Sequence, residues 1–298
     1  MQTVLITGGT GLVGQSISDL LKKEGLNVRI LSTNKPLADK HKHIFYWNPE
    51  KLAIDELALN EVDAIVNLAG SSINQPWTKS GKEQIVNSRV NSCQTLANAL
   101  NGKKIKCIIS ASAVGIYPDK NEQWLTEDAP ADTGFLAETV VKWEGASAEF
   151  KKHCERHISL RIGVVLSDKG GALPVIAKPV KFGIGSAIGS GKQYMSWIHI
   201  QDLARMVHFG LNNEKIKGTY NAVASNPVTN DVFTKTLAKT LKKPYFFPKV
   251  PSFVMRIILG ERADIVLKGS RVSNERFKKH DFQFEFDQVD RAFQSFNL

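Results

Sequence analysis

The chain has 298 residues, long enough for one large domain or for a domain plus a smaller lobe. Hydrophobic residues make up 42% and charged residues 23%, the composition of an ordinary soluble globular protein, and no apolar stretch approaches the roughly 20 residues of a membrane span. The net charge of +10 comes from scattered lysine pairs without an aromatic platform, so it favours anionic small molecules, and we expect neither a nucleic-acid nor a membrane partner.

The first predicted element is an apolar strand at Val4–Thr7 that runs into a glycine-rich turn. Gly8, Gly11 and Gly14 have the spacing G-x-x-G-x-x-G, and a helix and a second strand at Val28–Leu31 follow. Without side chains, such a backbone turns tightly, approaches a pyrophosphate and packs the helix against the sheet, while the helix N-terminus offers free N–H groups. The context predicts a dinucleotide-binding turn. An ordinary glycine-rich strand–helix turn is the alternative.

Further strands and helices alternate along the next two-thirds of the chain, which predicts a Rossmann-type α/β fold with a doubly wound parallel sheet. The strands are expected at Ile44–Tyr46, Asp63–Leu68, Ile105–Ser110, Ile158–Ile162 and Gly218–Ala222, and the helices at Gln15–Lys23, Lys79–Leu100 and Thr139–Lys152.

The segment Ser167–Ser196 is rich in Gly and Pro and has little periodicity, so we expect it to cover a site or to join a second lobe. A helix follows from about Trp197 to Leu211, and three more are predicted at Asp231–Leu241, Ser252–Leu259 and Arg262–Leu267. We therefore expect a nucleotide-binding domain over 1–225, with 166–202 contributing to the substrate lobe, and a small, mostly helical C-terminal lobe over 226–298.

Four motifs in this order resemble the extended short-chain dehydrogenase/reductases, the nucleotide-sugar epimerase/dehydratase-like group: Gly8–Gly14, Asn67–Gly70, Ser110–Ser112 and Trp197–Asp202. A closer likeness, to the atypical epimerase-like branch related to human SDR39U1, rests on Trp77-Thr78, Asn87–Arg89, Phe135–Glu138, Lys142–Glu144, Gly189–Gly191, Asn221–Ala224, Gly260-Glu261 and Phe282–Phe284. The resemblance implies an NAD(P)-binding protein with a small-molecule substrate such as a nucleotide sugar or a carbonyl compound.

The end of the second strand selects the cofactor in the parent family, where an acidic residue there binds the ribose hydroxyls of NAD. This chain has Ser32, Thr33 and Lys35 at that point and no acid until Asp39, which favours NADP over NAD. A solvated loop lysine is the alternative for Lys35. Arg89 is a second candidate anion ligand, and a structural helix salt bridge is its alternative.

The remaining cofactor contacts follow from the rule that ligands bind at the carboxyl ends of the strands. We expect the pyrophosphate at Thr10, Leu12 and Val13, the adenosine ribose and bridging region at Leu68, Ala69 and Gly70, and the nicotinamide end near Ser110, Ala111 and Gly163–Val165.

The parent family uses a Tyr-x-x-x-Lys pair on one helix face, with a Ser or Thr that orients the carbonyl. Ser112 fits the last role, but positions 135–138, where the tyrosine is due, are Phe-Leu-Ala-Glu. Tyr117 is a second candidate, with a structural loop tyrosine as its alternative. Glu138 and Lys142 have the pair's spacing and fit a solvated helix pair better. For His199 the family likeness implies a structural turn, with Asp202 capping the helix after it, and a substrate ligand is the alternative.

Two functions remain open from the sequence. The first is an NADP-dependent oxidoreductase or epimerase of unknown substrate with a different proton donor. The second is a non-catalytic NADP(H)-binding regulator or redox sensor. The cysteines, Cys93, Cys107 and Cys154, lie far apart without metal or redox spacing, which predicts reduced thiols in a cytoplasmic protein and no metal site. The chain begins directly with a core strand, so no leader peptide is expected.

Overall fold

The computed structural model describes residues 2–298. Its largest sheet has eight strands in the order β12-β8-β6-β5-β1-β2-β3-β4. β1, β2, β3, β5 and β6 pair in parallel, and the short β4 pairs antiparallel with β3. This order is that of a Rossmann sheet extended at both edges, so the predicted fold class is confirmed. The strands are β1 (Thr3–Thr7), β2 (Asn27–Ser32), β3 (Ile44–Asn48), β4 (Ala53–Ile54), β5 (Ala64–Asn67), β6 (Ile105–Ala113), β8 (Cys154–Ile162) and β12 (Gly218–Ala222).

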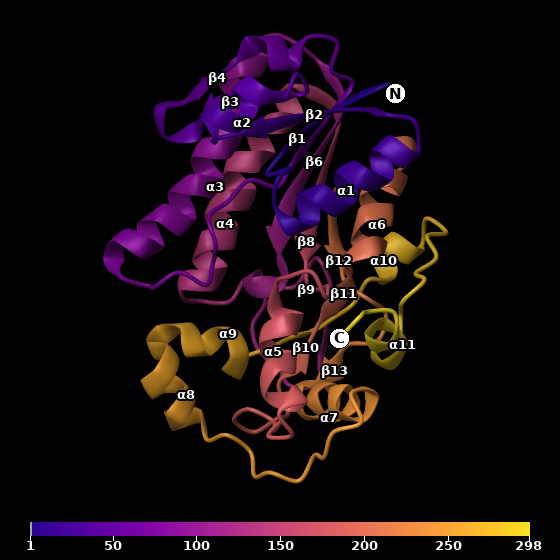
Figure 1. The fold of residues 1–298 in the computed structure, drawn as a ribbon. Coiled ribbons are helices and arrows are strands. Elements are labelled where there is room, and N and C mark those ends of the chain that lie inside the picture. Colours follow the sequence, from indigo (N-terminus) through magenta and orange to yellow (C-terminus); the bar gives the residue numbers. More distant parts are fainter. Residues whose placement is uncertain (1) are drawn as a thin grey trace. The chain divides into compact units, whose positions relative to one another are not determined.

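Helices cover both faces of this sheet, which explains why its central strands are continuous apolar runs. All five residues of β1 and all four of β5 are buried. Figure 1 shows α3 (Lys79–Leu100) and α4 (Phe135–Ala148) side by side on one face and α1 (Leu12–Lys23) and α6 (Ile200–Asn212) on the other. Because these strands are parallel, the carboxyl ends of β1, β2, β5 and β6 meet at one edge, where most of the predicted site residues lie.

The chain divides into two compact units, each described by itself. The first unit comprises residues 1–113, 134–161 and 203–220, which include most of the large sheet; the second comprises 114–133, 162–202 and 221–298. The second unit has three two-stranded sheets, in which β9 pairs with β11, β10 with β13 and β7 with β14. Those strands are β7 (Trp124–Leu125), β9 (Val164–Leu166), β10 (Tyr194–Met195), β11 (Trp197–His199), β13 (Val228–Thr229) and β14 (Arg271–Val272).

Short helices pack around a core of large apolar side chains in the second unit. Trp197, Phe233 and Phe293 are fully buried in this core. The helices are α5 (Ala172–Lys181), α7 (Asn230–Thr240), α8 (Ser252–Leu259), α9 (Asp264–Leu267), α10 (Glu275–Lys278) and α11 (Val289–Gln294). The remaining elements are α2 (Lys35–Lys40) and five 3₁₀ segments: Pro49–Lys51, Glu56–Leu59, Val114–Ile116, Glu149–Lys152 and Gly260–Ala263.

Three sequence expectations need correction. The irregular segment after Val165 contains α5, which tolerates Pro179 within its span. The segment Trp197–His199 is a strand, and the helix begins at Ile200. Asp202 therefore lies inside that helix instead of capping it, and its carboxylate accepts hydrogen bonds from the backbone N–H groups of Glu285 and Phe286, at 3.0 and 2.8 Å.

Candidate functional site

The glycine-rich turn connects β1 to α1 and is as tight as its spacing predicts. Gly8 has φ +66°, in the left-handed region that favours glycine. A Cβ on Gly14 would lie 2.2 Å from the carbonyl oxygen of Gly8, so the first turn of α1 packs directly on the strand end. Gly11 precedes α1 without a side-chain cap, and the first turn of the helix holds no acidic residue. The helix N-terminus thus offers free N–H groups and a partial positive charge, which suit a phosphate.

A buried polar network fixes the neighbouring strand end against this turn. The Thr7 hydroxyl donates to the Asn67 side-chain oxygen at 2.6 Å and accepts from the backbone N–H groups of Leu68 and Ala69, at 3.0 Å each. A Cβ on Gly8 would lie 3.1 Å from the Leu68 carbonyl carbon. The structure therefore brings the turn and the segment from Leu68 to Gly70 together. Thr7 and Asn67 were not predicted as site residues, although both end a buried strand.

Arg89 projects from α3 next to Gly70. A Cβ on Gly70 would lie 3.1 Å from the guanidinium carbon, and the guanidinium donates to the backbone carbonyls of Ser71 (3.2 Å) and Ile85 (2.9 Å). It lies 5.0 Å from the centre of the Trp143 ring, and burial lowers the pKa of Arg89 to about 10. Within residues 2–298 no carboxylate pairs with it. The helix salt bridge considered from the sequence is thus not formed.

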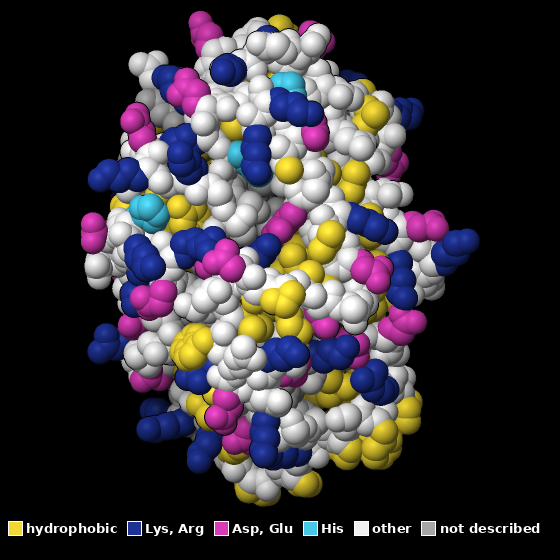
Figure 2. Space-filling model, turned by 180° about the vertical axis from the view of Figure 1, so that it is seen from behind, with side chains coloured by type: hydrophobic (Ala, Val, Ile, Leu, Met, Phe, Trp, Pro, Cys, Tyr) yellow, Lys and Arg dark blue, Asp and Glu magenta, His cyan; other side chains and the backbone are white. Residues whose placement is uncertain are grey.

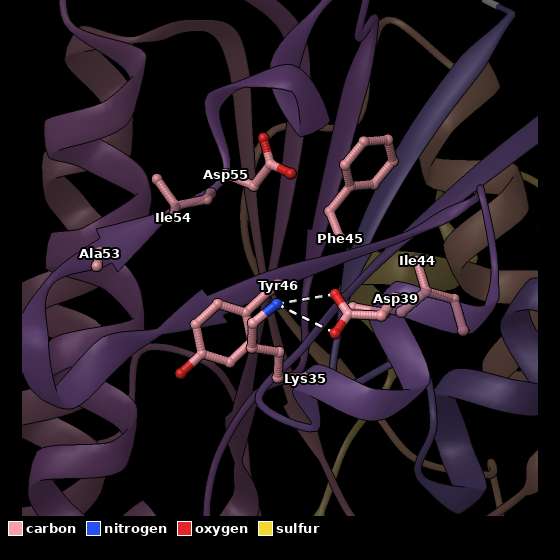
Figure 3. Close-up of a pocket in the computed structure, with 9 residues that line it drawn as sticks. Lys35, Asp39, Ile44, Phe45, Tyr46, Ala53, Ile54 and Asp55 are labelled. Atoms are coloured by element: carbon pink, nitrogen blue, oxygen red, sulfur yellow. Dashed lines mark hydrogen bonds and ion pairs between the residues drawn. The ribbon is translucent and has the colours of Figure 1, made fainter.

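The end of β2 carries no acidic side chain, as read from the sequence. Ser32 is buried and its hydroxyl accepts from the Asn34 backbone N–H at 3.2 Å. Lys35 begins α2 and forms an ion pair with Asp39 at 2.9 Å, with both side chains more than 60% exposed. That hydrogen bond raises the pKa of Lys35. The ion pair lies beside Tyr46 in a pocket of about 400 Å³ formed by α2, β3, β4 and Asp55 (Figure 3).

The structure places Ser110 and Val165 in different units. Ser110 ends the register between β5 and β6, opposite Asn67, but its hydroxyl is buried and 3.0 Å from Nε2 of His157. Its backbone, not its side chain, belongs to the edge where the site lies. Val165 belongs to β9 in the second unit, half-buried and paired with Ile198 of β11.

Ser112 is bound to an ion pair of the first unit in which Arg161 is buried and Glu144 is half-buried. Its hydroxyl donates to Oε1 of Glu144 at 2.5 Å. Arg161 holds the same carboxylate with two nitrogen atoms, Nε to Oε1 at 2.8 Å and Nη2 to Oε2 at 2.9 Å. The bidentate geometry is the strongest form of such a pair. Three elements, β6, α4 and β8, thus converge on Glu144, which the sequence reading named within the Lys142–Glu144 motif but not as a site residue.

The face of α4 that reaches Ser112 contains no Tyr-x-x-x-Lys pair. Residues four and eight positions before Glu144 share its side of the helix, and they are Val140 and Leu136. Glu138 and Lys142 are exposed and line a separate pocket of about 260 Å³ between α3 and α4. The structure therefore supports the sequence reading of these two residues as a solvated pair.

Tyr117 and His199 both have structural partners in the second unit. The Tyr117 hydroxyl is buried and donates to the Asn221 side-chain oxygen at 2.7 Å. His199 is stacked between Phe286 and Phe296, with ring centres 3.8 and 4.6 Å away, and its Nδ1 accepts from the Gln201 backbone N–H at the start of α6. His199 therefore has a structural role, but it lies at the end of strand β11 and not in the turn expected from the sequence.

The three cysteines are buried, and burial raises the pKa of Cys93 to about 12. Over residues 2–298 there is no group of three or more His, Cys, Asp and Glu side chains placed to hold a metal ion. In the same part of the chain, no helix has the length and apolar character needed to cross a membrane.

Comparison with known proteins decides the family. The NAD dependent epimerase/dehydratase family model matches residues 4–222. The chain belongs to this family. A second model, a domain of unknown function (DUF1731), matches residues 250–296. Among curated members of the family, the epimerase family protein YfhF of Bacillus subtilis is 36% identical over 293 residues, which cover 97% of this chain and 96% of that protein.

Two solved structures show that the likeness extends to the fold. The human epimerase family protein SDR39U1, crystallised with NADPH, superposes with a TM-score of 0.89 at 30% identity, over 100% of both chains. A nucleoside-diphosphate sugar epimerase from Corynebacterium glutamicum gives a TM-score of 0.80 at 31% identity, over 98% of this chain and 57% of that one. The predicted resemblance to the epimerase-like branch is confirmed.

Proposed function

We propose that this family member binds NADP(H) at the edge formed by β1, β2 and β5, and that it is an oxidoreductase or epimerase acting on a small molecule. One observation carries the proposal. The glycine turn leaves the N-terminus of α1 uncapped and free of acidic residues, directly beside the backbone of Leu68 and Ala69. Backbone N–H groups in this arrangement fit a pyrophosphate, which a side chain at Gly8 or Gly14 would displace.

The choice of NADP over NAD rests on two cations and on an absent carboxylate. The residues after β2 are Ser32, Thr33 and Lys35, which offer hydroxyls and an ammonium group where an acid would repel a 2′-phosphate. Arg89 is a desolvated cation without a carboxylate, so an anionic ligand would complete its surroundings. The NADPH present in the human SDR39U1 structure supports the same choice.

Bound NADP supplies the hydride acceptor or donor, and the chain supplies position and proton handling. Thr7 and Asn67 fix the backbone on which the ribose region is proposed to rest. Ser112 is the polar side chain proposed for contact with the substrate, held in place by Glu144 and Arg161.

A non-catalytic NADP(H)-binding regulator is the second candidate. It is favoured by one observation, the presence of Leu136 and Val140 on the α4 face that leads to Ser112, where a proton-donating pair would be needed. A regulator of this kind would pass the redox state of the nucleotide to a partner without turnover.

Titration of the full chain with NADPH and NADH, followed by nucleotide fluorescence, tests the common part of both candidates. We expect NADPH to bind more tightly than NADH, and absence of binding by either nucleotide overturns both. The second step separates them. NADPH consumption, or an epimerised sugar product detected by NMR, with any nucleotide sugar or carbonyl compound supports the enzyme. Product analysis is needed because an epimerase returns the hydride and leaves the nucleotide unchanged overall. Stable, tightly bound NADPH with no product across the series supports the regulator.

A further inference from the structure

The second unit carries a concentration of exposed apolar side chains on two segments, 172–192 and 241–268, which we call the basic apolar face. Of the thirteen large hydrophobic side chains that are exposed within residues 2–298, eight lie on these segments. They include all four exposed phenylalanines. The eight are Val175, Phe182, Ile184, Phe246, Phe247, Phe253, Ile257 and Ile258, with exposed fractions of 41–79%.

Direct contacts join the two segments into one surface. The Ser186 hydroxyl donates to the Pro248 carbonyl at 2.6 Å, and Val250 donates from its backbone N–H to Ala187 at 2.8 Å. The Lys249 ammonium group donates to the Ser190 carbonyl at 2.7 Å. The exposed rings therefore stand on a bonded platform within one unit. Figure 2 shows hydrophobic side chains gathered at its lower right, the side to which the turn of the view brings α8, with Lys and Arg side chains beside them.

The charge of this face has one dominant sign. The two segments contain nine basic residues and two acidic residues, a net charge of +7, compared with +10 for the whole chain. Asp264 is one of the two acids, and it pairs with Arg256 and Lys268. The basic residues are Lys178, Lys181, Lys192, Lys242, Lys243, Lys249, Arg256, Arg262 and Lys268.

From this combination we propose that the basic apolar face binds an anionic lipid surface. Apolar side chains on helix α8 and on the loop before it, flanked by lysines, suit insertion at the boundary of headgroups and acyl chains, and each Lys or Arg near such a surface adds to the attraction. A second copy of the chain fits less well, because a symmetric contact would place one strongly positive face against another. A single-stranded nucleic acid would use the rings but not the aliphatic side chains of Val175, Ile184, Ile257 and Ile258.

Contact of this kind does not require a spanning helix, so it is consistent with the lack of one in the described part of the chain. The proposal departs from the sequence expectation that the chain has no membrane partner. The inference does not depend on the proposed cofactor, because every residue of the face lies outside the first unit.

Co-sedimentation of the full chain with phosphatidylcholine vesicles, with and without phosphatidylglycerol, tests the proposal. We expect binding only to the anionic vesicles, with a loss at high salt. Neutralising Lys242 and Lys243 by glutamine lowers the vesicle partition coefficient by about thirty-fold, and Ile257→Ser lowers it by roughly tenfold. The matched controls, Lys103→Gln with Lys104→Gln and Leu57→Ser, change exposed residues of the first unit and leave binding unaltered.

A Phe253→Trp variant reports insertion directly, since its fluorescence shifts to the blue and is quenched by brominated lipid if the side chain enters the bilayer. Equal binding of all variants, or absence of binding to anionic vesicles, overturns the proposal. So does light scattering that shows a dimer broken by Ile257→Ser, or polarisation that shows a single-stranded oligonucleotide held by the same residues. Circular dichroism of each variant shows that it is folded.

Discussion

Alanine substitutions at Gly11 and at Gly14 test the binding role and the structural role of the glycine turn separately. A Cβ on Gly14 would lie 2.2 Å from the Gly8 carbonyl oxygen and 2.6 Å from Cα of Gly9, and neither backbone atom can move aside cheaply. A Cβ on Gly11 would meet only the Gly8 carbonyl oxygen, at 3.4 Å, which is an ordinary contact, and its φ of −82° suits any residue. Gly11→Ala therefore fits the folded chain, whereas Gly14→Ala does not.

The two variants should differ in stability. Overpacking costs about 1–3 kcal/mol, and the backbone contacts of Gly14→Ala place it at about 3 kcal/mol, a loss of roughly 6–12 °C in Tm. For Gly11→Ala, the weaker N-cap is offset by about 0.4–1 kcal/mol from the lower entropy of the unfolded chain, so its Tm should stay within about 3 °C of the parent. The affinity for NADPH should nevertheless fall by at least tenfold, because the methyl group stands where the phosphate meets the backbone N–H groups.

Thermal melts by circular dichroism and fluorescence titration with NADPH measure the two quantities on the same samples. Gly145→Ala is the control, since it adds a methyl group in α4 where nothing lies within 4 Å. It should leave the affinity for NADPH unchanged. A Gly11→Ala protein that binds NADPH as the parent does would refute the assignment of the phosphate turn, whatever the Tm of Gly14→Ala.

Three further outcomes follow from the structure. Arg89→Met should weaken NADPH binding at least tenfold in fluorescence titration. Arg29→Met is the control, because it also removes a guanidinium that lies near a ring and donates to backbone carbonyls, and it should leave NADPH binding unchanged. Equal losses of affinity in both variants would show a general effect of burial. Lys35→Gln should lower the ratio of NADPH to NADH affinity several-fold and Asp39→Asn should raise it, and an unchanged ratio in both would exclude Lys35 from the 2′-phosphate site. Burial lowers the pKa of His199 from 6.5 to about 4. The unfolded chain therefore takes up this proton first on acidification, and stability that is complete above pH 6.5 is lost as the pH falls towards 4. Urea unfolding measures the free energy of unfolding at neutral pH and at about pH 5. His199→Phe should reduce the difference between these two free energies by about 2 kcal/mol. The same difference in the parent and in the variant would contradict the lowered pKa of His199.

The elements that could be predicted are those whose buried face shows as a local pattern of apolar residues in the sequence. β1 is a short apolar run before glycines, and α3 has Thr78 as its N-cap, so both were predicted within one residue of their bounds. α5 was missed because its two prolines hide the apolar periodicity of a helix whose buried side chains, such as Leu173, pack on the second unit's core. α11 is too short to show a period, and only tertiary packing buries Phe293.

The same limit applies to the site. That Gly8–Val13 and Leu68–Gly70 lie together could be predicted because each segment follows a strand, and parallel strands end at one edge. Their role as cofactor contacts stays a prediction. The Thr7–Asn67 hydrogen bond joins residues 60 positions apart in the chain, and the Ser112–Glu144 hydrogen bond joins residues 32 positions apart. No local sequence pattern therefore predicts either hydrogen bond. The strand ends alone could have suggested the Thr7–Asn67 hydrogen bond, since these two polar residues are the last residues of two adjacent buried strands.

The contacts of Ser112 restrict the role proposed for this residue towards a substrate. A serine hydroxyl has one proton to donate and two lone pairs that accept. Ser112 donates its proton to Glu144, and Arg161 keeps that carboxylate in place with two bonds. Towards a ligand, Ser112 therefore presents lone pairs, which match a substrate hydroxyl and not a carbonyl oxygen. A carbonyl-orienting role would require the Ser112 proton to leave Glu144, so an alcohol is the functional group that this arrangement receives without rearrangement.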